Sequence, residues 1–275
     1  MAALPKTPEW QGVHAAAITP RGERGELNLG AAFDMIDYLC SARVSGIALF
    51  TDWGEYPAFS MDDRARLTNL AVKRSRAQVI VGVGSSTLDQ SVELARKARQ
   101  AGASALLVPA PNFYRYDADD LREYYSQFAT HVGGGIPLLL GSEPDAEIAR
   151  ELLDSGSYEG VEDSDRLFLA ARLEGRATIS ATACAAPELA MALNAAICGG
   201  SQDRIARLEG MRQELVGWLE RFPQPVGLKA AVATRGVKVG PLSVPLSAAR
   251  QQCLETFQTW LLNWLPSIRK VAACA

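Results

Sequence analysis

The run Gln78-Val79-Ile80-Val81-Gly82-Val83-Gly84 is one of seven short apolar runs that decide the fold of this 275-residue chain. It is continuously apolar rather than alternating, which is typical of a strand covered on both faces. Segments with helical periodicity, such as Leu29–Leu39, separate the runs. The alternation predicts a parallel sheet with crossover helices. The other six runs are Val13–Thr19, Ser45–Thr51, Ala105–Pro109, Ile136–Gly141, Tyr158–Glu162 and Ala177–Ala183.

The spacing of the runs indicates which parallel architecture they form. The first five begin at residues 13, 45, 78, 105 and 136, which is close to the roughly 30 residues per unit of a (β/α)8 barrel. A doubly wound open sheet is the alternative, but Ile18–Gly22 after the first run is not the glycine-rich turn that such sheets often carry. We therefore predict an α/β fold of TIM-barrel type over residues 1–186. The last barrel helix and a C-terminal helical region are expected over residues 187–275.

Composition excludes several classes of protein. Apolar residues make up 48% of the chain and charged residues 21%, and the net charge of −3 is spread along the sequence, so no nucleic-acid partner is expected. No apolar run approaches the roughly 20 residues that cross a bilayer, so no membrane partner is expected either. The N-terminus lacks the pattern of a signal peptide, which favours a cytoplasmic location. Five widely spaced cysteines and two histidines favour neither disulfides nor a zinc site.

The residues that follow the predicted strands carry a family resemblance. Barrel enzymes place their chemistry at the C-terminal ends of strands, and this chain has distinctive short motifs there. The motifs are Ile18-Thr19-Pro20, Asp52-Trp53-Gly54-Glu55, Pro111–Arg115, Ile179–Ala183 and Val226–Ala231. In the order and spacing of these motifs, the chain resembles the dihydrodipicolinate synthase and N-acetylneuraminate lyase family from about Gly12 to Leu262.

The resemblance implies a lyase of the aldolase type, but the family's catalytic residues do not carry over. In the family, a lysine that closes strand six forms a Schiff base with a 2-keto acid, and here Glu162 occupies that position. The family's proton-relay tyrosine aligns with Phe113 or, one residue further, with Tyr114, and its carboxylate-binding threonines align with Asp52 and Trp53. The Tyr-Asn pair that follows strand five in the family aligns with Gly141 and Ser142. The residues identical to those of the family are Gly54, Glu55 and Arg115.

A Schiff base needs a neutral amine on a rigid element beside the bound carbonyl. The chain has only six lysines, none of which follows a predicted strand, and the C-terminal lysine Lys229 aligns with one that has no catalytic duty in the family. Class I aldolase chemistry is therefore not expected. The six are Lys6, Lys73, Lys97, Lys229, Lys238 and Lys270.

Two interpretations of the remaining polar residues stay open. In the first, Asp52 and Glu162 act as acid and base, with Tyr114 as a third catalytic group and without a cofactor, although magnesium could bind such carboxylates. In the second, Glu162 and Asp163 are paired with arginine or solvated, in a site that has lost its reaction. Trp53 then fills the volume of a keto acid. The substrate-binding residues expected on the first interpretation are Arg115, Trp53, Gly54, Glu55, Phe113 and Ser142.

The resemblance also implies that the barrel is shortened. It places Ile179–Ala181 in strand eight, yet only about 19 residues separate the start of this run from that of strand six, where two units of roughly 30 residues are expected. Asp165–Glu174 leaves room for one short helix or one strand. We predict the loss of about one βα unit between strands six and eight. Partner subunits or the C-terminal helices are then expected to cover the open strand edges.

Three functions follow from these observations. The first is a carboxylate-based lyase acting on a small keto or hydroxy acid, and the second is a catalytically inactive binding or assembly subunit. The third is an ordinary pyruvate aldolase, which requires a lysine to reach the mouth of the barrel. A homodimer or homotetramer is expected from the resemblance and from the commonness of symmetric oligomers.

Overall fold

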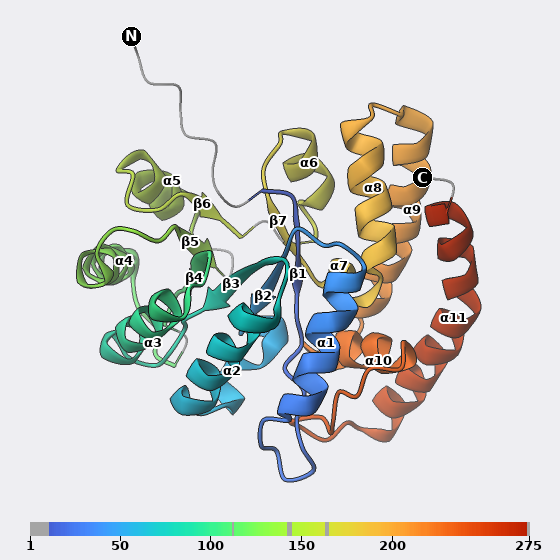
Figure 1. The fold of residues 1–275 in the computed structure, drawn as a ribbon, viewed down its shortest axis with the longest axis horizontal. Helices are drawn as coiled ribbons and strands as arrows, with labels where there is room; N and C mark the ends of the chain where they lie inside the picture. The colour runs from blue at the N-terminus through green and yellow to red at the C-terminus, as the bar shows by residue number, and fades with distance from the viewer. Residues whose placement is uncertain (1–10, 112, 142–144, 163–164, 274–275) are drawn as a thin grey trace.

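Seven parallel strands form one curled sheet in the computed structural model, which describes residues 11–111, 113–141, 145–162 and 165–273 (Figure 1). The order of strands across the sheet is β6-β5-β4-β3-β2-β1-β7. Every strand lies inside one of the seven predicted runs, so the parallel α/β fold expected from the sequence is confirmed. The strands are β1 (Val13–Ala16), β2 (Gly46–Leu49), β3 (Gln78–Gly82), β4 (Ala105–Pro109), β5 (Leu138–Gly141), β6 (Gly160–Val161) and β7 (Thr178–Ser180).

The two ends of the sheet are β6 and β7. The strand β7 pairs with β1, with Ile179 opposite His14, whereas β6 pairs with β5 through Gly160 and Val161. Within the described parts of the chain, no pairing joins β6 to β7. The sheet is thus a curled half-barrel in this structure, with the segment between these two strands lying at its open side.

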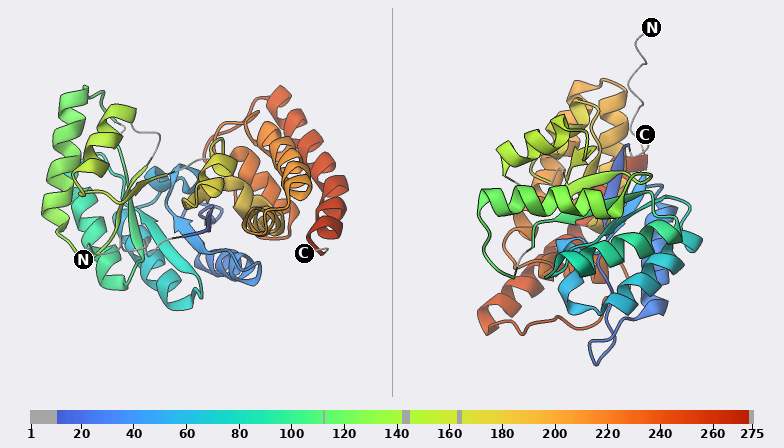
Figure 2. Two further views of the ribbon diagram at one scale, coloured as in Figure 1. Left: turned by 90° about the horizontal axis from the view of Figure 1, so that it is seen from above. Right: turned by 90° about the vertical axis from the view of Figure 1, so that its left-hand side faces the viewer.

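The helices fall into two groups around the outside of this curled sheet. Helices α2–α5 follow β2–β5, whereas α8–α11 gather beyond β1 and β7 (Figures 1 and 2). No helix in the described ranges is long and apolar enough to cross a membrane. The helices are α1 (Leu29–Ser41), α2 (Met61–Arg74), α3 (Leu88–Ala101), α4 (Ala118–Val132), α5 (Ala146–Asp154), α6 (Phe168–Leu173), α7 (Ala181–Ala185), α8 (Pro187–Cys198), α9 (Gln202–Leu219), α10 (Val226–Thr234) and α11 (Ala248–Ala273).

Helix termini follow the local sequence. Side chains of Asn28, Ser60 and Thr87 accept hydrogen bonds from backbone N–H groups in the first turns of α1, α2 and α3, as N-capping residues do. Gly102 ends α3 with a φ of +89°, a left-handed conformation that glycine adopts at little cost in free energy. The last predicted run differs from expectation, because Ser180 accepts from Ala183 N–H and starts the alanine-rich helix α7 where a longer strand was predicted.

Two apolar clusters fill the molecule. The larger one lies between the strands and the surrounding helices, and the smaller one lies on the other face of the sheet. Trp53 packs against this smaller inner cluster and caps it on the side of the strand ends. The inner cluster consists of Ala16, Ala48, Ile80, Ala105, Leu107, Leu139, Ala177 and Ile179.

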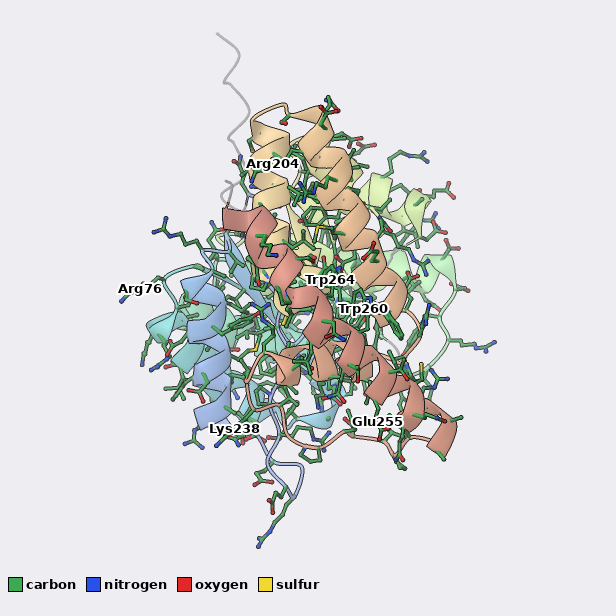
Figure 3. All side chains as sticks on the ribbon, turned by 90° about the vertical axis from the view of Figure 1, so that its right-hand side faces the viewer. Arg76, Arg204, Lys238, Glu255, Trp260 and Trp264 are labelled. Carbon is green, nitrogen blue, oxygen red and sulfur yellow. The ribbon has the colours of Figure 1, made fainter. Side chains whose placement is uncertain are left out.

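The C-terminal helices are held together by aromatic rings. Trp218 of α9 stacks on Phe257 of α11, with ring centroids 5.4 Å apart, and Trp260 stacks on Trp264 at 4.8 Å (Figure 3). Phe257, Leu261 and Trp264 are buried. These three side chains of α11 thus pack against the rest of the molecule rather than facing solvent.

His14 is a fully buried histidine of β1. Its Nε2 lies 3.1 Å from Gln78 Oε1 of β3. Burial lowers the pKa of His14 below 6.5, an effect that the Gln78 and Thr178 hydrogen bonds partly oppose and nearby Arg172 reinforces. His14 is therefore a residue of the core.

This burial predicts a pH dependence of stability. The unfolded chain takes up a proton on this imidazole near pH 6.5, whereas the folded chain resists it until a lower pH. The free energy of unfolding should therefore fall as the pH drops below about 6.5, by up to about 1.4 kcal/mol per unit. Urea unfolding midpoints at pH 7.5, 6.0 and 5.0 would test this. The slope of the free energy of unfolding against pH should be shallower for His14→Gln than for the unchanged protein. Equal slopes in the two proteins would contradict it.

Candidate functional site

The loop after β2 is held in an unusual backbone conformation. It contains two 3-10 turns, Asp52–Gly54 and Tyr56–Ala58, and two non-glycine residues with left-handed backbones, Phe50 (φ +56°) and Glu55 (φ +51°). Such conformations cost free energy and persist where surrounding contacts fix them, often at functional sites. The loop therefore has to be held by neighbouring elements.

Gly54 fits this loop because the space around it is small. A Cβ atom at this position would lie 3.2 Å from the Ala17 carbonyl oxygen and 3.3 Å from Thr19 Oγ1. The loop thus packs directly against the end of β1. Of the two residues predicted to replace the family's threonines, Asp52 is exposed and Trp53 is half-buried.

Glu55 forms a buried ion pair with Lys229 of α10. The side chain of Lys229 is 1% exposed and that of Glu55 9%, and Nζ of Lys229 also donates to the Pro241 carbonyl oxygen at 3.4 Å. Burial lowers the pKa of Lys229, and the contact with Glu55 opposes this shift. The structure therefore brings one lysine to the loop after β2, which sequence reasoning did not predict, and places Glu55 against that lysine.

Arg64 of α2 links this loop to the end of β3. Its guanidinium donates to the carbonyl oxygens of Gly84 (2.7 Å) and Gly82 (2.8 Å) and lies over the rings of Phe50 and Tyr56. Burial lowers the pKa of Arg64 to about 10. These contacts pack Arg64 against Phe50, which has a left-handed backbone, and connect the ends of β2 and β3.

Tyr56 is a buried phenol in the same loop that sequence reasoning missed. Burial, and secondarily the negative charge of Asp52, raises its pKa to about 12. Tyr56 therefore stays protonated near neutral pH and can donate a hydrogen bond. The only sequence signal was its place directly after Gly54-Glu55.

Glu162 directly follows β6. Its backbone N–H donates to the Leu140 carbonyl oxygen at 2.7 Å, which continues the pairing of β6 with β5. Its side chain is half-buried, and Oε2 lies 3.4 Å from the position that a Cβ of Gly141 would occupy. The carboxylate thus lies beside the end of β5.

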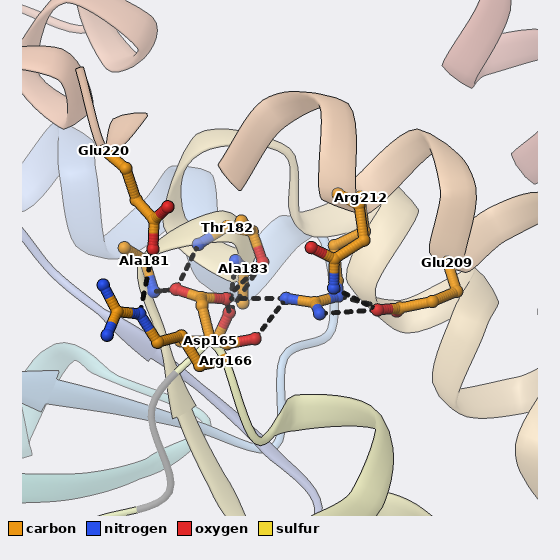
Figure 4. Close-up of polar contacts among 10 residues, drawn as sticks. Asp165, Arg166, Ala181, Thr182, Ala183, Glu209, Arg212 and Glu220 are labelled. Carbon is orange, nitrogen blue, oxygen red and sulfur yellow. Dashed lines mark hydrogen bonds and ion pairs between the residues drawn. The ribbon is translucent and has the colours of Figure 1, made fainter. Parts of the chain in front are cut away.

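Asp165 organises the segment after β6 (Figure 4). Arg212 of α9, which is fully buried, donates to the Asp165 carbonyl oxygen at 2.8 Å and forms a two-bond pair with Glu209 at 2.7 and 2.8 Å. We call these three residues with Ser180 and Thr182 the Asp165 network. The carboxylate of Asp165 accepts from five donors: Ser180 Oγ (2.6 Å), Thr182 Oγ1 (2.6 Å), Ala181 N–H (2.7 Å), Thr182 N–H (3.2 Å) and Arg212 Nη1 (3.3 Å).

A pocket of about 310 Å³ opens beside this network. It lies between the loop after β2 and the end of α9, and Trp53 is the only predicted site residue among the described residues that line it. The others could not be recognised from strand ends alone, because five of them belong to α9 or the segment that follows it. The lining residues are Trp53, Asp165, Arg166, Val216, Leu219, Glu220, Phe222 and Gln224.

The predicted residues after β4 lie apart from this pocket. Phe113 and Tyr114 are 71% and 64% exposed and contact each other edge to face, with centroids 4.9 Å apart. Arg115 is also exposed. Ser142, predicted to contact substrate, lies outside the described residues. Across the ranges that the structure does describe, no group of three His, Cys, Asp or Glu side chains is arranged to hold a metal ion.

Comparison with known proteins agrees with this architecture. The sequence profile of the dihydrodipicolinate synthetase family matches residues 9–148. The 4-hydroxy-tetrahydrodipicolinate synthase of Azoarcus sp. strain BH72 is 29% identical over 270 residues, which cover 84% of this chain and 90% of that enzyme.

Two solved structures share the fold at low sequence identity. A Ruminococcus gnavus sialic acid aldolase, solved as a catalytic lysine mutant, has a TM-score of 0.82 at 16% identity and covers 94% of this chain and 98% of its own. YagE of E. coli K12, solved with pyruvate, has a TM-score of 0.81 at 22% identity, with coverages of 92% and 99%. The resemblance seen in the sequence is thus confirmed, and the chain belongs to the dihydrodipicolinate synthetase family.

Proposed function

We propose that this protein is a lyase-type member of its family that binds a small organic acid at the strand ends without forming a Schiff base. The observation that carries the proposal is the position of Glu162. Its backbone continues the β5–β6 pairing, and the resemblance places the family's lysine at this residue. A carboxylate cannot form an imine with a ketone, because it has no nucleophilic nitrogen.

The positions of the described lysines support the proposal. Lys73, Lys97, Lys238 and Lys270 lie on helix surfaces or in an exposed turn. Lys229 is the one that reaches a strand-end loop, but it is almost completely buried and bound to Glu55. The fold itself does not depend on a reactive lysine, since the R. gnavus aldolase with a mutated catalytic lysine shares it.

Acid–base chemistry in this proposal comes from Asp52 and Glu162, with Arg115 as an anion contact. Tyr114 or Phe113 would occupy the proton-relay position, and Gly54, Glu55 and Ser142 would shape the binding loops. We also propose that the barrel has lost about one βα unit. The open side between β6 and β7, occupied in part by the short helix α6, is consistent with this. The barrel part would end near residue 186.

The second candidate is a non-catalytic binding or assembly subunit. It is favoured by Trp53, which stands where the family has a threonine and packs against the inner cluster. An indole in this place would occupy the space that a keto acid needs. In this case the carboxylates of Asp52 and Glu162 would have only a structural role.

Borohydride trapping would test the proposal. We expect no mass gain when the protein is incubated with pyruvate and reduced, because no described lysine offers an accessible amine at the strand ends. The R. gnavus aldolase with its lysine intact serves as positive control. A covalent adduct mapped to Lys229, or to any other lysine, would overturn the proposal.

A restored amine would separate the two candidates. If the mouth still admits a keto acid, Glu162→Lys should gain an adduct with pyruvate after reduction, whereas Glu162→Gln should not. Two negative results together would favour the non-catalytic subunit. One is a folded Glu162→Lys variant that forms no adduct with pyruvate. The other is a screen of keto and hydroxy acids, with and without magnesium, in which no compound shifts the melting temperature.

A further inference from the structure

The pocket beside Trp53 has apolar walls. Val216 and Leu219 of α9 and Phe222, which follows this helix, are buried, and Trp53 lines the pocket from the loop after β2. The volume of about 310 Å³ is at the lower end of the range for small-molecule sites, about 300–1,000 Å³. Two of these apolar side chains are aromatic, and aromatic rings pack favourably against one another. A compound with a single aromatic ring therefore fits both the size and the chemistry of these walls.

The charged side chains of the pocket already have partners. The carboxylate of Asp165 accepts from five donors of the Asp165 network. Arg166 and Glu220 form an exposed ion pair at the rim, with Nε 3.0 Å from Oε1, and Arg166 has a further interaction in addition to this pair (Figure 4). Exchanging such an exposed pair for a new one with a ligand gains little free energy. A net charge on the ligand therefore finds no unopposed partner in this pocket.

Gln224 supplies an uncharged polar group to the same pocket. Its side chain is exposed and, among the residues that the structure describes, it forms no hydrogen bond. A carboxamide both donates and accepts hydrogen bonds, so it can pair with an amide or a hydroxyl group of a ligand without any charge on either side.

We infer that this pocket binds an uncharged aromatic compound with one hydrogen-bonding group, such as an aromatic amide or a phenol. The ring would pack between Trp53 and Phe222, and the polar group would meet the amide of Gln224. The inference goes beyond the proposed function, because the strand ends are proposed to bind an acid and this pocket a neutral molecule. It does not depend on whether an acid binds at the strand ends.

An NMR titration with three compounds that share one ring would test the inference. Benzamide is neutral, benzoate carries a negative charge, and benzylamine is a cation near neutral pH. The methyl resonances of Val216 and Leu219 report binding in this pocket, separately from binding elsewhere. We expect benzamide to shift these resonances with a dissociation constant of about 1 mM or lower. Neither charged compound should bind here more tightly than benzamide.

Variants of the walls provide the second part of the test. Trp53→Leu removes one aromatic wall and should weaken benzamide binding by about fivefold, within the range of an aromatic contact. Its matched control is Tyr116→Leu, at an exposed aromatic residue that does not line the pocket. Val216→Thr keeps the volume of the wall but adds a hydroxyl that the ligand has to desolvate, so binding should also weaken by about fivefold. Val244→Thr, at an exposed valine outside the pocket, should leave the affinity unchanged.

Three results would overturn the inference. The first is no shift of the Val216 and Leu219 methyl resonances at about 10 mM benzamide. The second is a charged compound that saturates these shifts at a lower concentration than benzamide, and the third is equal affinity for benzamide in each variant and its control. The proposed function fails through a different observation, a borohydride-reduced adduct with a keto acid. Benzamide does not form such an adduct, so the two failures are distinguishable.

Discussion

Replacing Arg212 with methionine is expected to lower the free energy of unfolding by about 3–5 kcal/mol, the usual cost of removing one partner of a buried ion pair. Arg212 is fully buried between Asp165 and Glu209, whose side chains are only 13% and 14% exposed. Without the guanidinium, two carboxylates lose their counter-charge at the same time. The side chain also loses its contact with the Phe168 ring, whose centroid lies 4.8 Å away.

The matched control for this prediction is Arg166→Met, in the residue next to Asp165. Arg166 pairs with Glu220 at the surface, so its loss should cost no more than about 1 kcal/mol. Urea unfolding of the three proteins, with comparison of midpoints at equal m-values, measures the difference. If Arg212→Met is no less stable than Arg166→Met, the Asp165 network does not hold the segment between β6 and α7 in place.

The strands could be predicted from the sequence because the burial of each strand is visible in its own residues. A strand buried on both faces is a short apolar run, and all seven runs contain a strand. The exact end of the last strand could not be predicted from apolarity, because it depends on helix capping. Ser180 caps α7 three residues before the predicted run ends.

The site was less predictable, because its contacts join residues that are distant in the sequence. Strand-end reasoning predicted Asp52, Trp53 and Glu162 as site residues, and of these Trp53 lines the pocket beside the Asp165 network. It could not place Lys229, because a lysine on a helix gives no local sign that its amine reaches Glu55. Arg212 lies on the apolar face of α9 with Leu208 and Leu215, but this position alone does not show which carboxylates its guanidinium contacts.

Replacing Lys229 with methionine is the second change with a large expected effect. We expect it to lower the free energy of unfolding by about 3–5 kcal/mol, because the Glu55 carboxylate would remain buried without its cation. Glu55 also has a left-handed backbone in the loop that carries Trp53. Loss of the pair should therefore loosen this loop as well. Urea unfolding measures the first effect, and hydrogen exchange of the Asp52–Ala58 amides measures the second.

A double-mutant cycle separates the ion pair from general packing. Glu55→Gln alone should also destabilise the protein, because Lys229 then remains buried as an unpaired ammonium whose pKa burial lowers further. The double variant Glu55→Gln/Lys229→Met should be more stable than the sum of the single effects predicts, since neither charge is left alone. Additive effects would show that the two side chains do not stabilise each other. Lys229 would then be available for another role, and trapping of a keto acid at its amine would become the first experiment to repeat.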